Sequence, residues 1–98
     1  MPSAVRLGDV CSGHGCYPPR PNIAASNDVN VNGIGFHRVS DGWATHCCTS
    51  IPTECHDGTT IQGSKTVNVN GLPAARIGDS VSCGSTCLQG SSNVFAGG

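Results

Sequence analysis

The sequence predicts a small all-β domain of three hairpin-type repeats, stapled by a bound metal ion. Its 6 prolines and 14 glycines make up 20 of the 98 residues, well above average usage of roughly 12%, which nearly excludes long helices. The motif Val-Asn-Val-Asn-Gly occurs twice, at residues 29–33 and 67–71, and Asn-Gly is the strongest short hairpin signal. Only 4% of residues are aromatic, whereas 7 cysteines and 4 histidines offer metal ligands. We expect one domain, residues 1–98, without extension domains, in which a metal supplements a small core.

Charge and hydropathy exclude several classes of partner. Five Lys+Arg against six Asp+Glu give a net charge of -1, so counterion release from a nucleic acid would contribute little affinity. No apolar run approaches the roughly 20 residues that a bilayer span needs, and residues 1–9 lack the pattern of a signal peptide. We therefore expect synthesis in the cytoplasm, no nucleic-acid partner and no small-molecule substrate.

The first recurring pattern is Arg-x-x-Asp. It occurs as Arg6-Leu7-Gly8-Asp9, Arg38-Val39-Ser40-Asp41 and Arg76-Ile77-Gly78-Asp79. A pair that recurs in every repeat is typical of a structural feature, so we interpret each as a half-buried ion pair that fixes a turn.

The second pattern sets an aliphatic residue, a serine and a valine at intervals of three. Its copies are Ile23, Ser26 and Val29; Ile61, Ser64 and Val67; and Leu88, Ser91 and Val94. In the first two copies the valine opens the alternating motif, which indicates a strand with both valines on one face and a turn at Asn-Gly. The return strands are predicted at residues 35–39 and 73–77.

The loops between the two patterns carry the candidate metal ligands. His14 lies five residues after Asp9, His46 lies five after Asp41, and Cys83 lies four after Asp79. The longest loop, between Asp41 and Ile61, also contains His56. A three-His, one-Cys set suits a structural zinc ion with four ligands, so we predict that His14, His46, His56 and Cys83 bind one Zn²⁺.

Other histidines and cysteines leave alternatives open. His37 falls within a return strand, so we expect it to be no ligand and its replacement to leave the fold stable. Because cytoplasmic thiols stay reduced and seven is an odd number, metal binding is favoured over disulfides. Cys47 or Cys48, Cys55 and Cys87 could each replace a neighbouring ligand; buried thiols are the commoner fate of the remaining cysteines, which are Cys11, Cys16, Cys47, Cys48, Cys55 and Cys87.

The sequence carries little that indicates an enzyme. Glu54 is its only glutamate, and neither the H-E-x-x-H motif nor the zinc deaminase motif is present. No local signature marks a nucleophile among the cysteines. We predict no catalytic residues.

The motifs resemble those of the PAAR-repeat proteins, which form the tips of contractile injection machines. The motif that names this family stands intact as Pro73-Ala74-Ala75-Arg76, with degenerate counterparts at residues 2–6 and 35–38. The resemblance implies a conical all-β domain with a structural zinc near its apex, held by three histidines and one cysteine.

The resemblance also implies a function and a partner. PAAR-repeat proteins sharpen a trimeric β-helical spike for membrane puncture, either the VgrG spike of a type VI secretion system or a phage tail spike. We expect one tip per trimer, delivered outward with transient membrane contact, and docked through an apolar base. The alternatives are a free-standing zinc-dependent binding module and, less favoured, a zinc or thiol enzyme. The residues expected to form the base are Val29, Val31, Val67, Val69, Val94 and Phe95.

Overall fold

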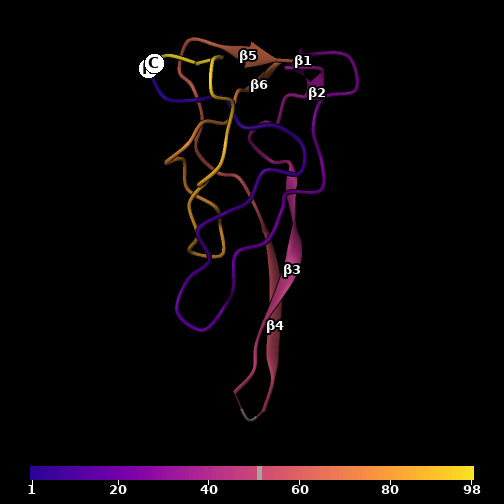
Figure 1. Ribbon diagram of the computed structural model, residues 1–98, viewed down its shortest axis with the longest axis vertical. Helices are drawn as coiled ribbons and strands as arrows, with labels where there is room; N and C mark the ends of the chain where they lie inside the picture. The colour runs from indigo at the N-terminus through magenta and orange to yellow at the C-terminus, as the bar shows by residue number, and fades with distance from the viewer. Residues whose placement is uncertain (51) are drawn as a thin grey trace.

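The computed structural model describes residues 1–50 and 52–98, which contain strands and turns but no helix. Three antiparallel hairpins account for all named strands (Figure 1). The all-β prediction is confirmed, and no helix in the described ranges is long and apolar enough to cross a membrane. The strands are β1 (Asn30–Val31), β2 (Ile34–Gly35), β3 (Gly42–Cys48), β4 (Glu54–Thr59), β5 (Asn68–Val69) and β6 (Leu72–Pro73).

The turns of the two short hairpins form at the predicted Asn-Gly motifs, but the return strands β2 and β6 end at Gly35 and Pro73, whereas strands over residues 35–39 and 73–77 were expected. β1 pairs with β2 through Val31 and Ile34, and Asn32 and Gly33 make the turn between them. Both turn residues have positive φ angles, 56° and 77°, as the turn that suits a two-residue hairpin requires. The hairpin of β5 and β6 repeats this geometry, although all four strands are only two residues long.

The third repeat is divided between the two ends of the chain. The N–H of Ala4 donates to the carbonyl of Val94 at 2.9 Å. The equivalent bond joins Phe36 to Val29 in the first repeat and Ala74 to Val67 in the second. The N-terminal segment therefore supplies the return strand of the third hairpin, and the termini lie together at one end of the molecule (Figure 1).

A closed ring of backbone hydrogen bonds joins the three repeats. The N–H of Val5 donates to the carbonyl of Ala75, that of Ala75 to His37, and that of His37 to Val5, each at 3.0 Å. All three residues are fully buried. This ring marks a pseudo-threefold axis within a single chain.

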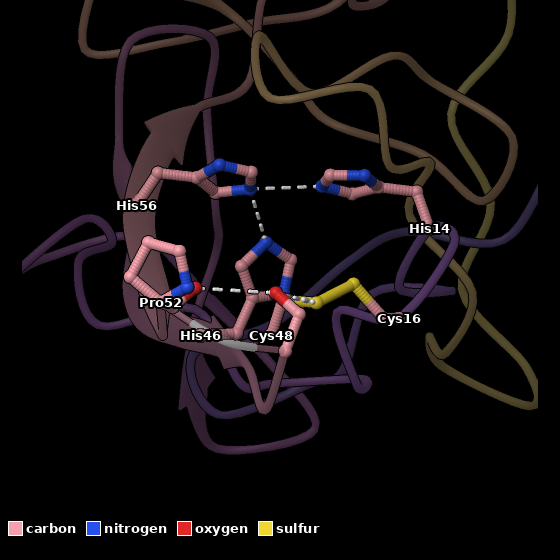
Figure 2. Close-up of a disulfide and its surroundings, with 7 residues drawn as sticks. His14, Cys16, His46, Cys48, Pro52 and His56 are labelled. Carbon is pink, nitrogen blue, oxygen red and sulfur yellow. Dashed lines mark hydrogen bonds between the residues drawn. A yellow bond between two sulfur atoms is a disulfide. The ribbon is translucent and has the colours of Figure 1, made fainter.

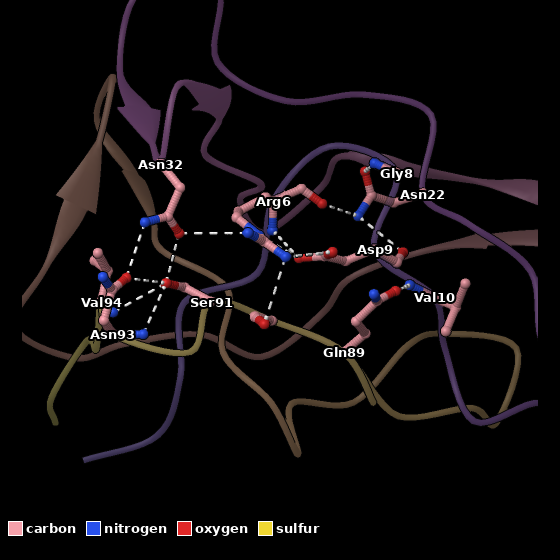
Figure 3. A network of polar contacts seen from close by, with 11 residues as sticks. Arg6, Gly8, Asp9, Val10, Asn22, Asn32, Gln89, Ser91, Asn93 and Val94 are labelled. Carbon is pink, nitrogen blue, oxygen red and sulfur yellow. Dashed lines mark hydrogen bonds and ion pairs between the residues drawn. The ribbon is translucent and has the colours of Figure 1, made fainter.

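Each Arg-x-x-Asp motif forms the predicted ion pair. The backbone N–H and the Nε of Arg6 both donate to Oδ2 of Asp9, at 2.8 and 3.0 Å, while its Nη2 donates to Oδ1 (Figure 3). The pairs of Arg38 with Asp41 and of Arg76 with Asp79 have the same pattern. The motifs are therefore structural elements of the turns.

The arginines also tie each repeat to another. Nη1 of Arg6 donates to Oδ1 of Asn32, an oxygen that also accepts from the hydroxyl of Ser91 (Figure 3). Arg38 donates in the same way to Asn70. In the remaining repeat Arg76 donates to the carbonyl of Gly97 instead, because no Asn-Gly pair follows Val94 at the equivalent place.

The apolar residues divide into two small clusters. One lies among the short hairpins and comprises Ala4, Val31, Phe36, Val69, Ala74 and Ala96. The other joins two residues of the hydrogen-bonded ring, Val5 and Ala75, to residues of the long loops, namely Cys11, Trp43, Val81 and Cys87. Val31 and Val69 are only 3% and 2% exposed, so the expectation that they belong to a docking surface was wrong. They fill the core of the chain itself.

The longest element is a hairpin where a loop was expected. β3 and β4 occupy much of the segment between Asp41 and Ile61, and they pair in antiparallel register with an irregularity between Trp43 and His46. The hairpin extends away from the end that carries the termini and the short hairpins (Figure 1). The molecule, 42 Å long and 23 by 22 Å across, therefore narrows from a broad end to the tip of this hairpin.

Candidate metal centre

Four side chains converge beside the long hairpin. His46 lies on β3 and His56 on β4, while His14 and Cys83 come from the loops of the other two repeats. One ligand atom from each lies within 4.8 Å of all the others. The structure therefore brings together the four residues that the loop spacing selected.

The pairing of β3 with β4 sets two histidines face to face. His46 and His56 are directly opposite each other in the register, so their side chains lie on the same face of the hairpin. Nδ1 of His46 lies 2.9 Å from the carbonyl of Pro18 and, facing an acceptor, carries the ring proton. Its Nε2 is then unprotonated in the neutral ring and available as a ligand.

The three imidazoles point their Nε2 atoms toward one place (Figure 2). Nε2 of His56 lies 2.7 Å from that of His46 and 2.9 Å from that of His14. Because Nε2 of His46 is unprotonated, Nε2 of His56 would have to donate its one proton to it. The same nitrogen could then not accept a proton from His14, so neutral rings cannot make both contacts normal hydrogen bonds. A cation shared by the three lone pairs would satisfy all of them, and so the residues fit a metal ion.

The electrostatics keep His14 in the form that binds metals. Desolvation, followed by the charges of His46 and His56, lowers the pKa of the His14 imidazole below its ordinary value. A neutral imidazole is the metal-binding form of histidine.

Tyr17 was not singled out by the sequence, yet its ring packs against all three imidazoles. The ring centroids lie 4.0 Å from His56, 4.8 Å from His14 and 5.0 Å from His46, and the first two contacts are stacked. Tyr17 also pairs with His14 across a tight turn, in which each backbone N–H donates to the carbonyl of the other. Its position three residues after a candidate ligand was the only available signal.

Two glycines let the Cys83 loop approach the centre. A Cβ at Gly58, on β4, would lie 3.3 Å from Cβ of Cys83, tighter than ordinary van der Waals contact. Gly84 has a φ of 105°, in the region that favours glycine, and turns the chain directly after Cys83. The loop is thereby held against β4 with its thiol near the imidazoles.

Disulfides, which the sequence disfavoured, bind four of the cysteines. Cys16 is bonded to Cys48 and Cys47 to Cys55, so the expectation that these four remain thiols was wrong. The error arose because reduced thiols were inferred from an expected cytoplasmic location. That inference took no account of which cysteines the fold brings into contact. None of the four is free to replace a histidine or Cys83.

Cys11 and Cys87 match the expectation of buried thiols. Both are free and buried, and burial raises the pKa of the Cys87 thiol to about 12. A thiol that stays protonated is a poor metal ligand, and Cys87 is not among the converging donors.

His37 lies outside the centre, as the sequence predicted, and is fully buried. Its Nδ1 lies 2.7 Å from the carbonyl of Ala24, and its Nε2 lies 2.8 Å from the hydroxyl of Thr60. Nε1 of Trp43 donates to the same hydroxyl at 2.9 Å. Its burial favours the opposite of the expectation that replacing His37 leaves the fold stable, since removal would leave a cavity and unpaired polar groups.

Comparison with known proteins agrees with the repeat and the centre. No curated protein sequence matches the chain significantly. The family model described as the PAAR motif matches residues 12–89, a range that holds all four converging side chains. Since this match covers well over half of the 98 residues, the chain belongs to the PAAR motif family.

Proposed function

We propose that this chain is a zinc-stapled tip that caps and sharpens a trimeric β-helical spike, either a VgrG spike or a phage tail spike, for membrane puncture. The PAAR family has a structural spike-tip role in contractile injection systems and associates with VgrG spikes in general. The finer statement, that this chain seats as one copy on one trimer, is supported by its internal symmetry. The proposed route is synthesis in the cytoplasm, assembly on the spike and delivery outward.

The observation that carries the proposal is the ring of hydrogen bonds through Val5, His37 and Ala75. It gives one chain three nearly equivalent sides around a single axis. A partner with threefold symmetry offers three identical surfaces around its own axis. A pseudo-threefold monomer can satisfy all three at once and cover the strand edges exposed at the end of the spike.

Zinc is the metal we propose for the centre. Three imidazole nitrogens and one thiolate are a typical ligand set for structural, tetrahedral Zn²⁺. When bound, the ion would supply folding free energy, and structural zinc in small domains has an apparent binding free energy of about 10–16 kcal/mol. His14, His46, His56 and Cys83 would hold it, joining the loops of all three repeats.

The broad end of the molecule is the surface we propose for docking. Its exposed apolar side chains include Val29 at 38%, Ile34 at 39% and Phe95 at 50% exposed. Val67 and Val94 pack partly against the inner cluster. Since only 11% of residues are charged, the contact depends little on screened electrostatics and should resist salt.

Light scattering of the chain mixed with the spike protein encoded beside it tests this proposal. One chain per spike trimer, stable in moderate salt, is the expected result. A 3:3 assembly, or dissociation by salt, would contradict it. Val29→Asp with Phe95→Asp should abolish binding, whereas the control Ile61→Asp, which alters a flank residue 60% exposed, should not.

A further inference from the structure

The disulfides surround the proposed metal centre. Each of its three histidines lies within two residues of a cystine: Cys16 follows His14 by two positions, Cys47 follows His46 directly, and Cys55 directly precedes His56. Figure 2 shows the Cys16–Cys48 bond beside the three imidazoles. Cys83 is the one converging residue with no cystine this close in sequence.

We propose that the Cys16–Cys48 and Cys47–Cys55 bonds form a redox-sensitive clamp that determines how tightly the centre holds its metal. This inference rests on the proposed metal binding by the same four residues. With both bonds formed the histidines are held in position for the ion, and reduction releases them.

The Cys16–Cys48 bond positions His14. The backbone N–H groups of His14 and Tyr17 donate only to each other's carbonyls, so this turn is stabilised locally. Its nearest links to the long hairpin include the Cys16–Cys48 bond, the hydrogen bond from His46 to Pro18, and the stacking of Tyr17 on the imidazoles. The latter two depend on the histidines themselves, and the hydrogen bond from Ala44 to the carbonyl of Pro21 lies four residues beyond the turn, so the disulfide is the covalent brace next to His14.

The Cys47–Cys55 bond positions His46 relative to His56. It joins β3 and β4 at the pair of residues next to the two histidines, on the side of the hairpin tip. Glu54 and Cys55 on β4 are both exposed, whereas Cys48 opposite Glu54 is buried, so little packing holds β4 at this point. The covalent bond prevents the end of the hairpin from separating and keeps the imidazoles face to face.

Reduction changes each bond in a defined way. A phosphine reductant attacks one sulfur and breaks the S–S bond; water then gives its oxygen to phosphorus and its protons to the two thiolates. The products are two thiols and a phosphine oxide, with two electrons transferred to each disulfide. Groups that orient metal ligands typically alter affinity 10–100-fold, and we expect an effect of roughly this size.

The test measures Co²⁺ and Zn²⁺ affinity by competition with a chromophoric chelator, and ligand geometry by the Co²⁺ absorption spectrum. Cys16→Ser with Cys48→Ser, and Cys47→Ser with Cys55→Ser, should each weaken binding roughly tenfold or more. The control pair Thr45→Ser with Thr59→Ser changes exposed residues of the same strands and should bind as the wild type does. Unchanged affinity in the cysteine variants would overturn the proposal.

Reduction of the intact chain guards against variants that fail to fold. Phosphine should weaken metal binding by the wild type, and reoxidation by glutathione disulfide should restore it. The variant with all four cysteines replaced by serine has no disulfide to reduce and should not respond to phosphine. If the oxidised wild type binds neither metal, the proposed metal function fails; if it binds and reduction has no effect, only the clamp fails.

Discussion

His46 and His56 face each other across the β3–β4 hairpin with their Nε2 atoms 2.7 Å apart. Imidazoles are not brought this close by hydrophobic packing, and the proton on Nδ1 of His46 leaves its Nε2 as an acceptor. His14 completes the arrangement from another repeat. The hairpin therefore presents two candidate ligands to a centre to which all three repeats contribute.

We predict one Zn²⁺ per chain, whose removal destabilises the fold. The apolar clusters are small, and the ion would add a covalent link among three loops that otherwise meet through one small cluster and hydrogen bonds. Elemental analysis of the purified protein should give a ratio of one, and a strong chelator should lower the melting temperature markedly. Two zinc ions per chain, or an unchanged melting temperature after verified metal loss, would contradict the prediction.

Each of the four ligand substitutions should weaken both metal binding and thermal stability. The variants are His14→Ala, His46→Ala, His56→Ala and Cys83→Ser, and every one leaves a bound cation with three protein ligands. Metal content and calorimetric melting should fall together in all of them. Thr45→Ala, at an exposed position beside His46 on β3, is the matched control and should behave as the wild type.

Tyr17→Ala should reduce metal affinity without removing a ligand. Its ring covers His56 and His14 in stacked contacts, so truncation exposes the imidazoles to water and lets His14 move. Tyr17→Phe keeps the ring and should retain nearly full affinity. Equal losses in both variants would assign the effect to the hydroxyl instead of the stacking.

Much of the fold was predictable because the repeat is carried by short, local patterns. The Asn32-Gly33 turn, the Arg6–Asp9 pair and their equivalents follow from residues at most three positions apart, and local geometry decides them. The four converging side chains were also predicted from the sequence, since corresponding positions in the loops of a repeated unit lie at the same end of the domain.

The long hairpin and the disulfides were not predictable in the same way. The segment from Gly42 to Thr59 contains two adjacent cysteines and no run of alternating apolar residues, so its strand pairing depends on contacts with other loops. The Cys16–Cys48 bond spans 32 residues, and neither spacing nor composition indicates which cysteines meet. The burial of Val31 and Val69 was missed because an alternating pattern shows only that apolar side chains share one face of a strand. It does not show whether the same chain or a partner covers that face.

Protein stability should decrease as the pH falls below about 6.5, partly because of His37. Desolvation lowers the pKa of His37 in the folded chain, so the unfolded chain takes up its proton first. The stability contributed by the neutral ring is fully present above the pKa that His37 has in the unfolded chain. It is lost as the pH falls toward the pKa of His37 in the folded chain, and the free energy of unfolding then decreases by at most about 1.4 kcal/mol per pH unit. Comparing urea unfolding of the wild type and His37→Gln at equal metal loading isolates this contribution, since acid also competes with metal at the other histidines.

His37→Ala should destabilise the chain while leaving its metal content unchanged. The side chain is fully buried, and it bonds Ala24 and Thr60. Large-to-small substitution in a core costs about 2–5 kcal/mol, and the unpaired Thr60 hydroxyl adds to this. Chemical unfolding together with elemental analysis separates the two effects, and loss of zinc from a folded variant would count against the assignment of His37 as purely structural.

The three Arg-Asp pairs provide an internal comparison of buried charge. The Arg76 side chain is 10% exposed, against 18% for Arg6, and Arg76 also donates to the carbonyls of Gly97 and Gly63. Asp79→Ala leaves this more buried guanidinium without its carboxylate, which should cost about 3–5 kcal/mol. Asp9→Ala should cost less, because water reaches Arg6 more easily. Arg76→Leu combined with Asp79→Leu should recover part of the lost stability, since it removes the uncompensated charge. Urea unfolding measures the loss of unfolding free energy in each variant. Equal losses for Asp79→Ala and Asp9→Ala would show that the turn geometry, and not the buried charge, determines the contribution of these pairs.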